Sequence, residues 1–399
     1  MYLILVKTNF QIHLGIAAAL PLFYEFSGSQ AVFSERIFDM KRFSLLTLAI
    51  CGILCFAGCG TDQPAASSQS KSGSESSAED SQTAADAVYE DTQELMGTVI
   101  MVRAYGAHGK EGVEAAFARA KELEQVFSNT IADSEVNQVN QAAKAAVGTE
   151  VPISADMAHV LETALEYGEK SGGMLDCTIG DLIDLWGIGT DHAAIPADGK
   201  IQALLRPDGW KDVSYHAESG SLSFASDAVT LNFGAVAKGY ISDAMKTALE
   251  ETGVTSALMS LGGNVMTLGV KPDGSSWTVA ITDPFSPDSL IASLHVTDQA
   301  VVTSGNYEKY FEENGKRYHH ILDPDTGAPS ESDVVSTTII ADNGIDCDAL
   351  STATYLLGSD AGMQLINSLD GIEAVFVKAT GELVTSDGMD AYQLQEITS

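Results

Sequence analysis

A chain of 399 residues with 45% hydrophobic residues can bury a large core, in one large domain or in two or three smaller ones. Its 55 acidic side chains outnumber its 21 basic ones and give a formal net charge of −34, which argues against nucleic acid as a partner because phosphates require basic patches. The five cysteines form no CxxC pair and no Cys/His cluster, so a zinc site is not predicted.

The N-terminal part of the chain has the pattern of an export signal. Residues 40–58 begin with a basic pair, continue as a short apolar run and end directly before Cys59, which resembles a bacterial lipoprotein signal. The run is too short for a comfortable membrane span. We expect Cys59 to carry the lipid, and a plain secretion signal or anchor is the alternative. Residues 1–39 are interpreted as a start-site artefact.

A polar segment follows the signal. Residues 59–93 comprise the cysteine and a run rich in Ser, Ala, Gln, Asp and Glu. Such a run buries too little apolar surface to offset the entropy of ordering it, so we expect a flexible acidic tether. The pattern predicts a folded body at residues 94–399, held at the outer side of a cell membrane by a lipid anchor.

Strands and helices intermix in the body. Helical spacing of apolar residues predicts helices at 111–127, 155–171, 236–251 and 347–357. Strands are expected at 98–104, 229–233, 257–261, 265–270, 277–282, 291–296, 300–303, 307–312, 317–322 and 334–341. The Asn314-Gly315 pair indicates a hairpin between 307–312 and 317–322. Strands without regular β-α alternation favour an α+β body with mixed or antiparallel sheets flanked by helices.

Several widespread catalytic signatures are missing. The chain has no GxGxxG, GxxxxGK[ST], HExxH or GxSxG sequence, which weakens dehydrogenase, P-loop and esterase interpretations. Dense polar clusters remain at the predicted junctions between strands and helices.

Two of these clusters have oxygen and cation chemistry. Asp348 and Thr352 are four residues apart on one helical face, and carboxylate and hydroxyl oxygens are ligands that Mg²⁺ prefers. The alternative is a helix cap at Asp346 or Asp348. Residues 232–240 turn from a predicted strand into a helix whose N-terminal amides, with Lys238, suit an anion. A tight turn with a surface lysine is the alternative.

The remaining clusters have plain structural alternatives. Residues 174–180 read as a loop entering the core, 261–264 as a glycine bulge or a close ligand approach, and 303–307 as a polar turn. In a strand, His319 and His320 point to opposite faces, so at most one of them faces a given site.

Taken together and in order, the clusters resemble the ApbE family of FAD:protein FMN transferases. The motifs are Met96-Gly97-Thr98, Leu175-Asp176 through Gly180 with Leu185-Trp186-Gly187, Gly234 through Tyr240, Leu261-Gly262-Gly263, Thr303-Ser304-Gly305, His320 through Pro324 with Thr326-Gly327, and Asp348 through Thr352. Each motif is weak singly, but seven in one order are specific. A lipoprotein leader is also common in that family.

The resemblance implies Mg²⁺-dependent transfer of the FMN moiety of FAD to a Thr or Ser hydroxyl of an exported redox protein, with release of AMP. It implies metal ligation by the side chains of Asp348 and Thr352 and the carbonyls of Ala235 and Ser351. His320 is then the candidate base. The positions matching the FAD pocket are Met96, Met174, Leu175, Asp176, Asn232, Lys238 and Leu322.

Some residues depart from the family pattern. Many members have Asp where Asn232 stands, Pro at Cys177, and an aromatic residue or Asn near Thr130. A threonine cannot stack on a flavin, so an FAD pyrophosphatase that releases FMN and AMP is an alternative. A flavin-binding lipoprotein without catalysis is a third interpretation. Cys177 and Cys347 each adjoin a proposed site aspartate, and we expect buried free thiols rather than a disulfide.

Overall fold

The computed structural model describes residues 87–397. The expected signal at 40–58, the lipidation at Cys59 and the interpretation of residues 1–39 lie outside this part of the chain. Among the described helices, none combines the length and the apolar character that crossing a membrane would need. The described chain is α+β with antiparallel sheets, as the sequence predicts.

A sheet of eight strands forms the centre, and all its neighbouring strands are antiparallel. Its order is β1 (Val88–Leu95), β2 (Thr98–Tyr105), β6 (Ala257–Leu261), β7 (Asn264–Leu268), β10 (Ala300–Gly305), β13 (Val334–Ala341), β14 (Glu373–Lys378) and β15 (Leu383–Thr385). Strands distant in sequence therefore lie side by side, and the loops at each end of the sheet can combine residues from the whole body.

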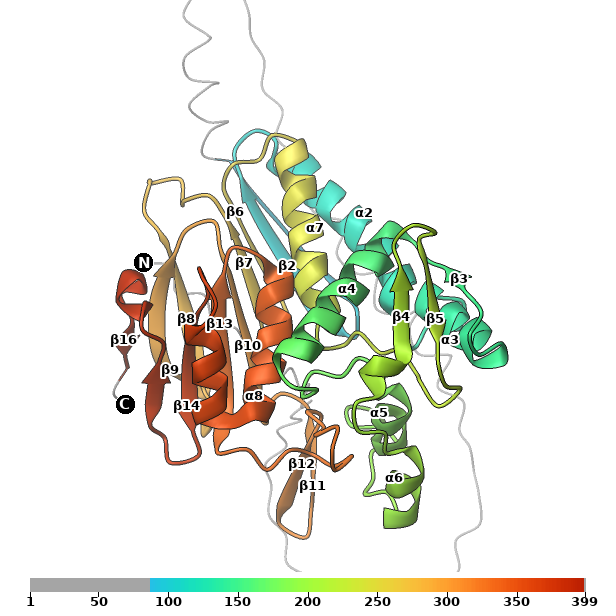
Figure 1. Ribbon diagram of the computed structural model, residues 1–399. Helices are drawn as coiled ribbons and strands as arrows, with labels where there is room; N and C mark the ends of the chain where they lie inside the picture. Colours follow the sequence, from blue (N-terminus) through green and yellow to red (C-terminus); the bar gives the residue numbers. More distant parts are fainter. Residues whose placement is uncertain (1–86, 398–399) are drawn as a thin grey trace, which may run out of the picture. The chain divides into compact units, whose positions relative to one another are not determined.

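Both faces of this sheet are covered (Figure 1). Helices α2 (Gly109–Phe127), α7 (Ala237–Glu251) and α8 (Gly344–Asn367) pack on one face, and a sheet of β8 (Trp277–Asp283), β9 (Ser286–Val296) and β16 (Gln395–Glu396) packs on the other. The two-residue period of a strand explains both contacts, since Ala257 and Met259 join the core under the helices while Leu258 joins the core under β8 and β9.

Smaller elements surround the helical side. They are α3 (Glu135–Ala145), β3 (Val151–Pro152), α4 (Ala155–Lys170), α5 (Gly180–Trp186), α6 (Asp198–Leu204), η1 (Gly209–Asp212), β4 (Val213–His216), β5 (Ser221–Phe224), β11 (Tyr310–Glu313) and β12 (Lys316–His319). The short η2 (Met389–Tyr392) instead packs with β9 on the other side of the sheet. A third apolar cluster, with Leu182 and Trp186 fully buried, joins α5, α6 and the β11–β12 hairpin. This cluster holds the loop after β12 beside the first turn of α5.

The structure corrects several expected elements. The predicted tether reached residue 93, but Val88–Leu95 is strand β1, paired along its length with β2. The predicted strand at 229–233 is an extended segment with one isolated bridge, from Thr230 to Ile179. The hairpin is shorter than predicted, so His320 lies just beyond β12. Helix α8 runs ten residues beyond its expected end at 357, with a kink at Gly358.

One end of the central sheet gathers two of the predicted motifs. Met96-Gly97 and Gly262-Gly263 are tight turns with positive φ, linking β1 to β2 and β6 to β7. A Cβ on Gly262 would overlap Thr98. The expected bulge at 261–264 is therefore a two-residue turn, packed so closely on β2 that only glycine fits.

Helices α7 and α8 cross in close contact at glycines. A Cβ on Gly239 would overlap the backbone of Gly344, and a Cβ on Gly344 would overlap Ser242. Asp243 of α7 also accepts hydrogen bonds from the backbone amides of Gly344 (2.6 Å) and Ile345 (2.9 Å), so one helix caps the other. The first turns of the two helices are thereby held together.

Candidate active site

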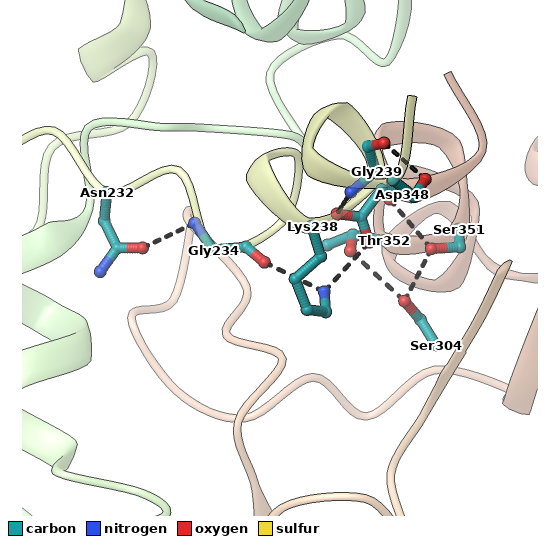
Figure 2. Close-up of polar contacts among 9 residues, drawn as sticks. Asn232, Gly234, Lys238, Gly239, Ser304, Asp348, Ser351 and Thr352 are labelled. Carbon is teal, nitrogen blue, oxygen red and sulfur yellow. Dashed lines mark hydrogen bonds and ion pairs between the residues drawn. The ribbon is translucent and has the colours of Figure 1, made fainter. Parts of the chain in front are cut away.

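Asp348 lies at this helix crossing. Its side chain is almost fully buried, and its Oδ2 accepts a hydrogen bond of 2.9 Å from the amide of Gly239. Its Oδ1 lies 3.1 Å from Nζ of Lys238, whose ammonium is also 3.5 Å from the carbonyl oxygen of Gly234 (Figure 2). Helix α8 begins at Gly344 after an N-cap at Asn343, so Asp348 is not the cap. Two predicted clusters, 110 residues apart in the chain, therefore meet at one carboxylate.

Hydroxyl groups continue the site along α8. Ser351 donates to the carbonyl oxygen of Asp348 (2.9 Å), and its Oγ lies 2.8 Å from Oγ of Ser304 on β10. Thr352 lies 3.5 Å from the same Ser304 hydroxyl, a weak contact that leaves its Oγ1 available (Figure 2). The carbonyl of Ser351 accepts a hydrogen bond from Thr337, which occupies one of its two lone pairs.

Backbone and amide hydrogen bonds position the loop before α7. The carbonyl oxygen of Leu231 accepts hydrogen bonds from the amide groups of Asn129 and Asn140, both at 3.0 Å. Asn232 donates its backbone N–H to Cys177 (2.8 Å), and its side-chain oxygen accepts from the N–H of Gly234 (2.9 Å). This segment is extended without being a strand because the loop at 177–180 bonds to the backbone of Thr230 and Asn232, while asparagine side chains bond to the backbone of Leu231.

The motif around Asp176 is joined to the same loop. Asp176 is buried, and it accepts hydrogen bonds from the N–H and the hydroxyl of Thr178 and from the N–H of Trp210. Burial raises the pKa of its carboxyl despite these hydrogen bonds. Leu175 is a core residue, whereas Met174 is partly exposed. Of these predicted pocket residues, Met174 alone has its side chain appreciably accessible, and Asp176 organises the loop.

Met96 is the first residue of the two-residue turn at the sheet end. Its φ of 54° is uncommon for a residue other than glycine, and its N–H donates to Oε1 of Glu124 on α2 at 2.6 Å. Its side chain is partly exposed. The turn geometry accounts for this φ, and the FAD contact expected of Met96 stays a prediction.

His320 has a defined tautomer. Its Nδ1 lies 3.3 Å from the carbonyl oxygen of Lys309, so Nδ1 carries the proton and Nε2 has a free lone pair. Desolvation, together with the positive charges of Lys309 and Lys238, lowers the pKa of His320 to about 3. The ring is therefore neutral at pH 7, and it lies within electrostatic range of the lysine that binds Asp348.

The residues on either side of His320 are structural. His319 is buried, with Nε2 2.9 Å from the carbonyl of Ser330 and its ring against Tyr355. Asp323 accepts hydrogen bonds from the N–H groups of two residues in its own turn, as expected of a residue that holds the loop. Leu322, a predicted pocket residue, is buried in the apolar cluster of α5 and α6. Its side chain anchors the His320 loop to this apolar cluster.

Glu308 lies within electrostatic range of Asp348 and Lys238, and the sequence interpretation did not single it out. Burial, together with the charge of Asp348, raises the pKa of Glu308 to about 8, although Lys238 and Lys309 oppose the shift. The side chain is only partly exposed. A single acidic residue in Asn306-Tyr307-Glu308 matches no motif, and only the fold brings it near Asp348.

The family model for the ApbE family matches residues 96–376. The chain belongs to the ApbE family. A relative from Treponema pallidum (strain Nichols), described as an FAD:protein FMN transferase, is 35% identical over 310 residues, covering 72% of this chain and 84% of the relative. One from Klebsiella pneumoniae (strain 342) with the same description is 33% identical over 300 residues, covering 75% and 92%.

Solved structures agree with the family assignment. The ApbE protein from Thermotoga maritima has a TM-score of 0.70 and 27% identity, covering 77% of this chain and 99% of its own. The flavin transferase ApbE from Vibrio cholerae has a TM-score of 0.69 over the same shares at 24% identity, which bears on the fold alone. The α+β prediction and the predicted family are both confirmed.

Three departures from the ApbE pattern have a place in the structure. Asn232 keeps the loop turn through its side-chain oxygen, so the missing charge does not disrupt the backbone. Thr130 is exposed just after α2 and contacts the hydroxyl of Ser128. Cys177 and Cys347 are both free and buried, as expected. Burial raises the pKa of both thiols, so neither is a reactive thiolate.

The donor set of this ApbE site suits a hard cation. Within residues 87–397, no three His, Cys, Asp or Glu side chains cluster in a way that could hold a metal. A single buried carboxylate with hydroxyl and carbonyl oxygens is instead the kind of set that Mg²⁺ uses when substrate phosphates and water supply the other ligands. The contact of Lys238 with Asp348 and with the carbonyl of Gly234 shows that these oxygens already hold a cation.

Proposed function

We propose that this chain transfers the FMN moiety of FAD to a Thr or Ser hydroxyl of an acceptor redox protein and releases AMP. Family membership and relatives described as FAD:protein FMN transferases support an enzyme of this kind. The observation that carries the proposal is the meeting of Asp348, Lys238 and the loop at 234–235, with the neutral ring of His320 within electrostatic range. Groups suited to bind an anion, to bind a cation and to accept a proton thus lie within electrostatic range of one another.

Mg²⁺ fits the oxygens present. The side chains of Asp348 and Thr352 and the carbonyls of Ala235 and Ser351 would hold it. The bound metal would neutralise the pyrophosphate and stabilise the leaving phosphate. Met96, Met174 and the loop at Asn232 would contact the rest of FAD.

The reaction balances with groups of the chain. The acceptor oxygen forms a bond to the FMN phosphorus, the bond from this phosphorus to the bridging oxygen breaks, and AMP leaves with that oxygen. The hydroxyl proton goes to Nε2 of His320, which the hydrogen bond from Nδ1 to Lys309 keeps unprotonated. The negative pyrophosphate opposes the lysine charges that lower the pKa of His320, so substrate binding makes the ring a stronger base.

A transfer assay tests the proposal. The full chain in detergent is incubated with FAD, Mg²⁺ and a protein acceptor bearing a Thr or Ser hydroxyl, and the denatured acceptor is analysed by mass spectrometry. We expect an added FMN with the parent protein and none with Asp348→Asn. Asp298→Asn is the matched control, since Asp298 pairs with Lys246 elsewhere on α7. An acceptor that stays unmodified, with no free FMN, would contradict the proposal.

The same assay separates the two alternatives. An FAD pyrophosphatase would release FMN and AMP at a rate that the acceptor does not change, and product chromatography with and without acceptor detects this. A flavin-binding protein without catalysis would leave FAD intact in every sample. The small, exposed side chain of Thr130, which cannot stack on a flavin, is the observation that favours testing for hydrolysis.

We also propose that the protein works at the outer side of the cell membrane, anchored by lipid on Cys59. The leader pattern at 40–58 supports this location, and exported redox proteins would then be the acceptors. Cys59→Ser should move the chain from the membrane fraction to the soluble fraction. Unchanged fractionation would contradict the anchor.

A further inference from the structure

Lys238 occupies the carboxylate that the metal needs. Its Nζ lies between Oδ1 of Asp348 (3.1 Å) and the carbonyl oxygen of Gly234 (3.5 Å), and Figure 2 shows the ammonium between these two oxygens. Lys238 is in the first turn of α7, and Asp348 is in the second turn of α8. The close crossing of the two helices leaves the lysine and the carboxylate facing each other.

The ion pair compensates a buried charge. The side chain of Asp348 is 3% exposed and that of Lys238 is 25% exposed. An ionised carboxylate at this depth is costly without a partner, and Lys238 is its ion-pair partner in the described chain. One monovalent cation of the protein itself therefore balances the carboxylate in this arrangement.

A divalent cation cannot share this position at low cost. A metal bound through Asp348 and the loop at 234–235 would lie within a few ångströms of the ammonium, where like charges repel strongly at the reduced dielectric of a protein. Lysine is a compact charge on a flexible stem, so its head group can move without moving the helix. Metal entry therefore requires Lys238 to leave Asp348.

The dinucleotide provides the destination. A pyrophosphate would bring two negative charges to the N-terminal turn of α7, and Lys238 belongs to this turn. We propose that Lys238 competes with the metal for Asp348, so that the metal binds tightly only when the pyrophosphate draws the lysine away. This inference rests on the proposed function for the identity of the nucleotide, and it makes Lys238 a positioning residue that couples two binding events.

Metal binding measured without catalysis tests this coupling. Mn²⁺ binding to the full chain in detergent is followed by electron paramagnetic resonance, with and without ADP as the pyrophosphate ligand. In the parent protein, ADP should tighten Mn²⁺ binding strongly. Lys238→Met should bind Mn²⁺ alone about tenfold more tightly than the parent, within the usual range of such couplings. The tightening by ADP should then be correspondingly smaller.

Matched variants make the result specific. Lys246→Met removes another lysine of α7 that pairs with an aspartate, Asp298, at 3.0 Å, and it should leave Mn²⁺ binding unchanged. Asp348→Asn should abolish the binding. Lys238→Met should have a lower melting temperature than the parent without metal, because the buried carboxylate loses its partner, and Mn²⁺ should restore it. Lys238→Gln provides a second variant should the methionine fold poorly.

The outcomes distinguish this inference from the proposed function. Mn²⁺ binding to Lys238→Met and Lys238→Gln that is equal to or weaker than in the parent overturns the competition, whatever the transfer assay shows. Tighter binding in these variants supports it, even if no acceptor receives FMN. If no FMN is transferred but Lys238 still competes with Mn²⁺, only the proposed reaction is contradicted.

Discussion

At the scale of single residues, His320 combines a fixed tautomer with a neutral ring. His320→Gln should lower FMN transfer by about 10²–10⁴-fold, the usual contribution of a general base, because glutamine cannot accept the hydroxyl proton. Binding of ADP and Mn²⁺ should remain. Rates are measured with saturating FAD, and a variant that retains near-parent activity would exclude His320 as the base.

The lowered pKa of His320 has a consequence for stability. The folded pKa is about 3, against ~6.5 for an unperturbed histidine. As the pH falls through 6.5, the unfolded chain takes up this proton first, so the stability contributed by the neutral ring is present above pH 6.5 and lost progressively towards pH 3. The melting temperature of His320→Gln relative to the parent should therefore rise between pH 7.5 and 4.5. Parallel melting curves at all pH values would contradict this.

Local patterns in the sequence singled out Asp348 and Lys238, and the fold brings these two side chains together. Asn232, whose role the family resemblance implied, is bonded to Gly234, the residue whose carbonyl oxygen contacts Lys238. The sequence alone could not show that Asp176 and Leu175 are buried, because the same residue types line pockets and cores. Glu308 was missed because its significance comes from neighbours 70 and 40 residues away in the chain, Lys238 and Asp348.

At the scale of elements, the crossing of α7 and α8 positions the carboxylate. Gly239→Ala should destabilise the protein by about 1–3 kcal/mol or more and weaken Mn²⁺ binding, because a methyl group there overlaps the backbone of Gly344. Gly199→Ala in α6 is the control, since nothing lies within 4 Å of its added methyl group. Chemical denaturation measures both variants. Equal effects would show that the helix contact is not tight.

Asp243 should hold the start of α8 through charge-assisted hydrogen bonds. Asp243→Ala removes the acceptor of two backbone N–H groups at a helix N-terminus and should cost about 2 kcal/mol. Asp243→Asn keeps one acceptor oxygen and should cost less. Burial raises the pKa of Asp243 to about 6, so the neutral amide avoids a desolvation penalty that the carboxylate bears. A larger loss in the asparagine variant would contradict this account.

Long helices and apolar strands were the most predictable elements. The apolar spacing of 111–127 defined α2 closely, and short apolar runs defined β6, β8 and β13, which are buried almost throughout. The edge strand β1 was missed because its exposed face is acidic and polar like the segment before it. The segment 229–233 was mistaken for a strand because Asn129 and Asn140, 91 or more residues away, hold it extended.

At the scale of the whole molecule, the two buried thiols report on opening of the structure. Cys177 and Cys347 adjoin Asp176 and Asp348, so both should react slowly with a thiol reagent in the native protein and rapidly after unfolding. Mg²⁺ with ADP at about one hundred times the dissociation constant should slow labelling by roughly a hundredfold. Peptide-resolved mass spectrometry reads each thiol separately, and fast native labelling would contradict the burial.

The order of the site along the chain restricts when a nucleotide can bind. Asp348, the ion-pair partner of Lys238, is synthesised 110 residues after it. Asp348 lies on α8, and α8 packs on β14, which follows α8 in the chain. A partly synthesised chain that ends before α8 therefore has Lys238 but lacks the carboxylate through which we propose the divalent ion binds. Because that contact closes a long loop, it belongs to the late steps of assembly. Nucleotide and metal should then slow the opening of the finished enzyme and leave the speed of its assembly unchanged.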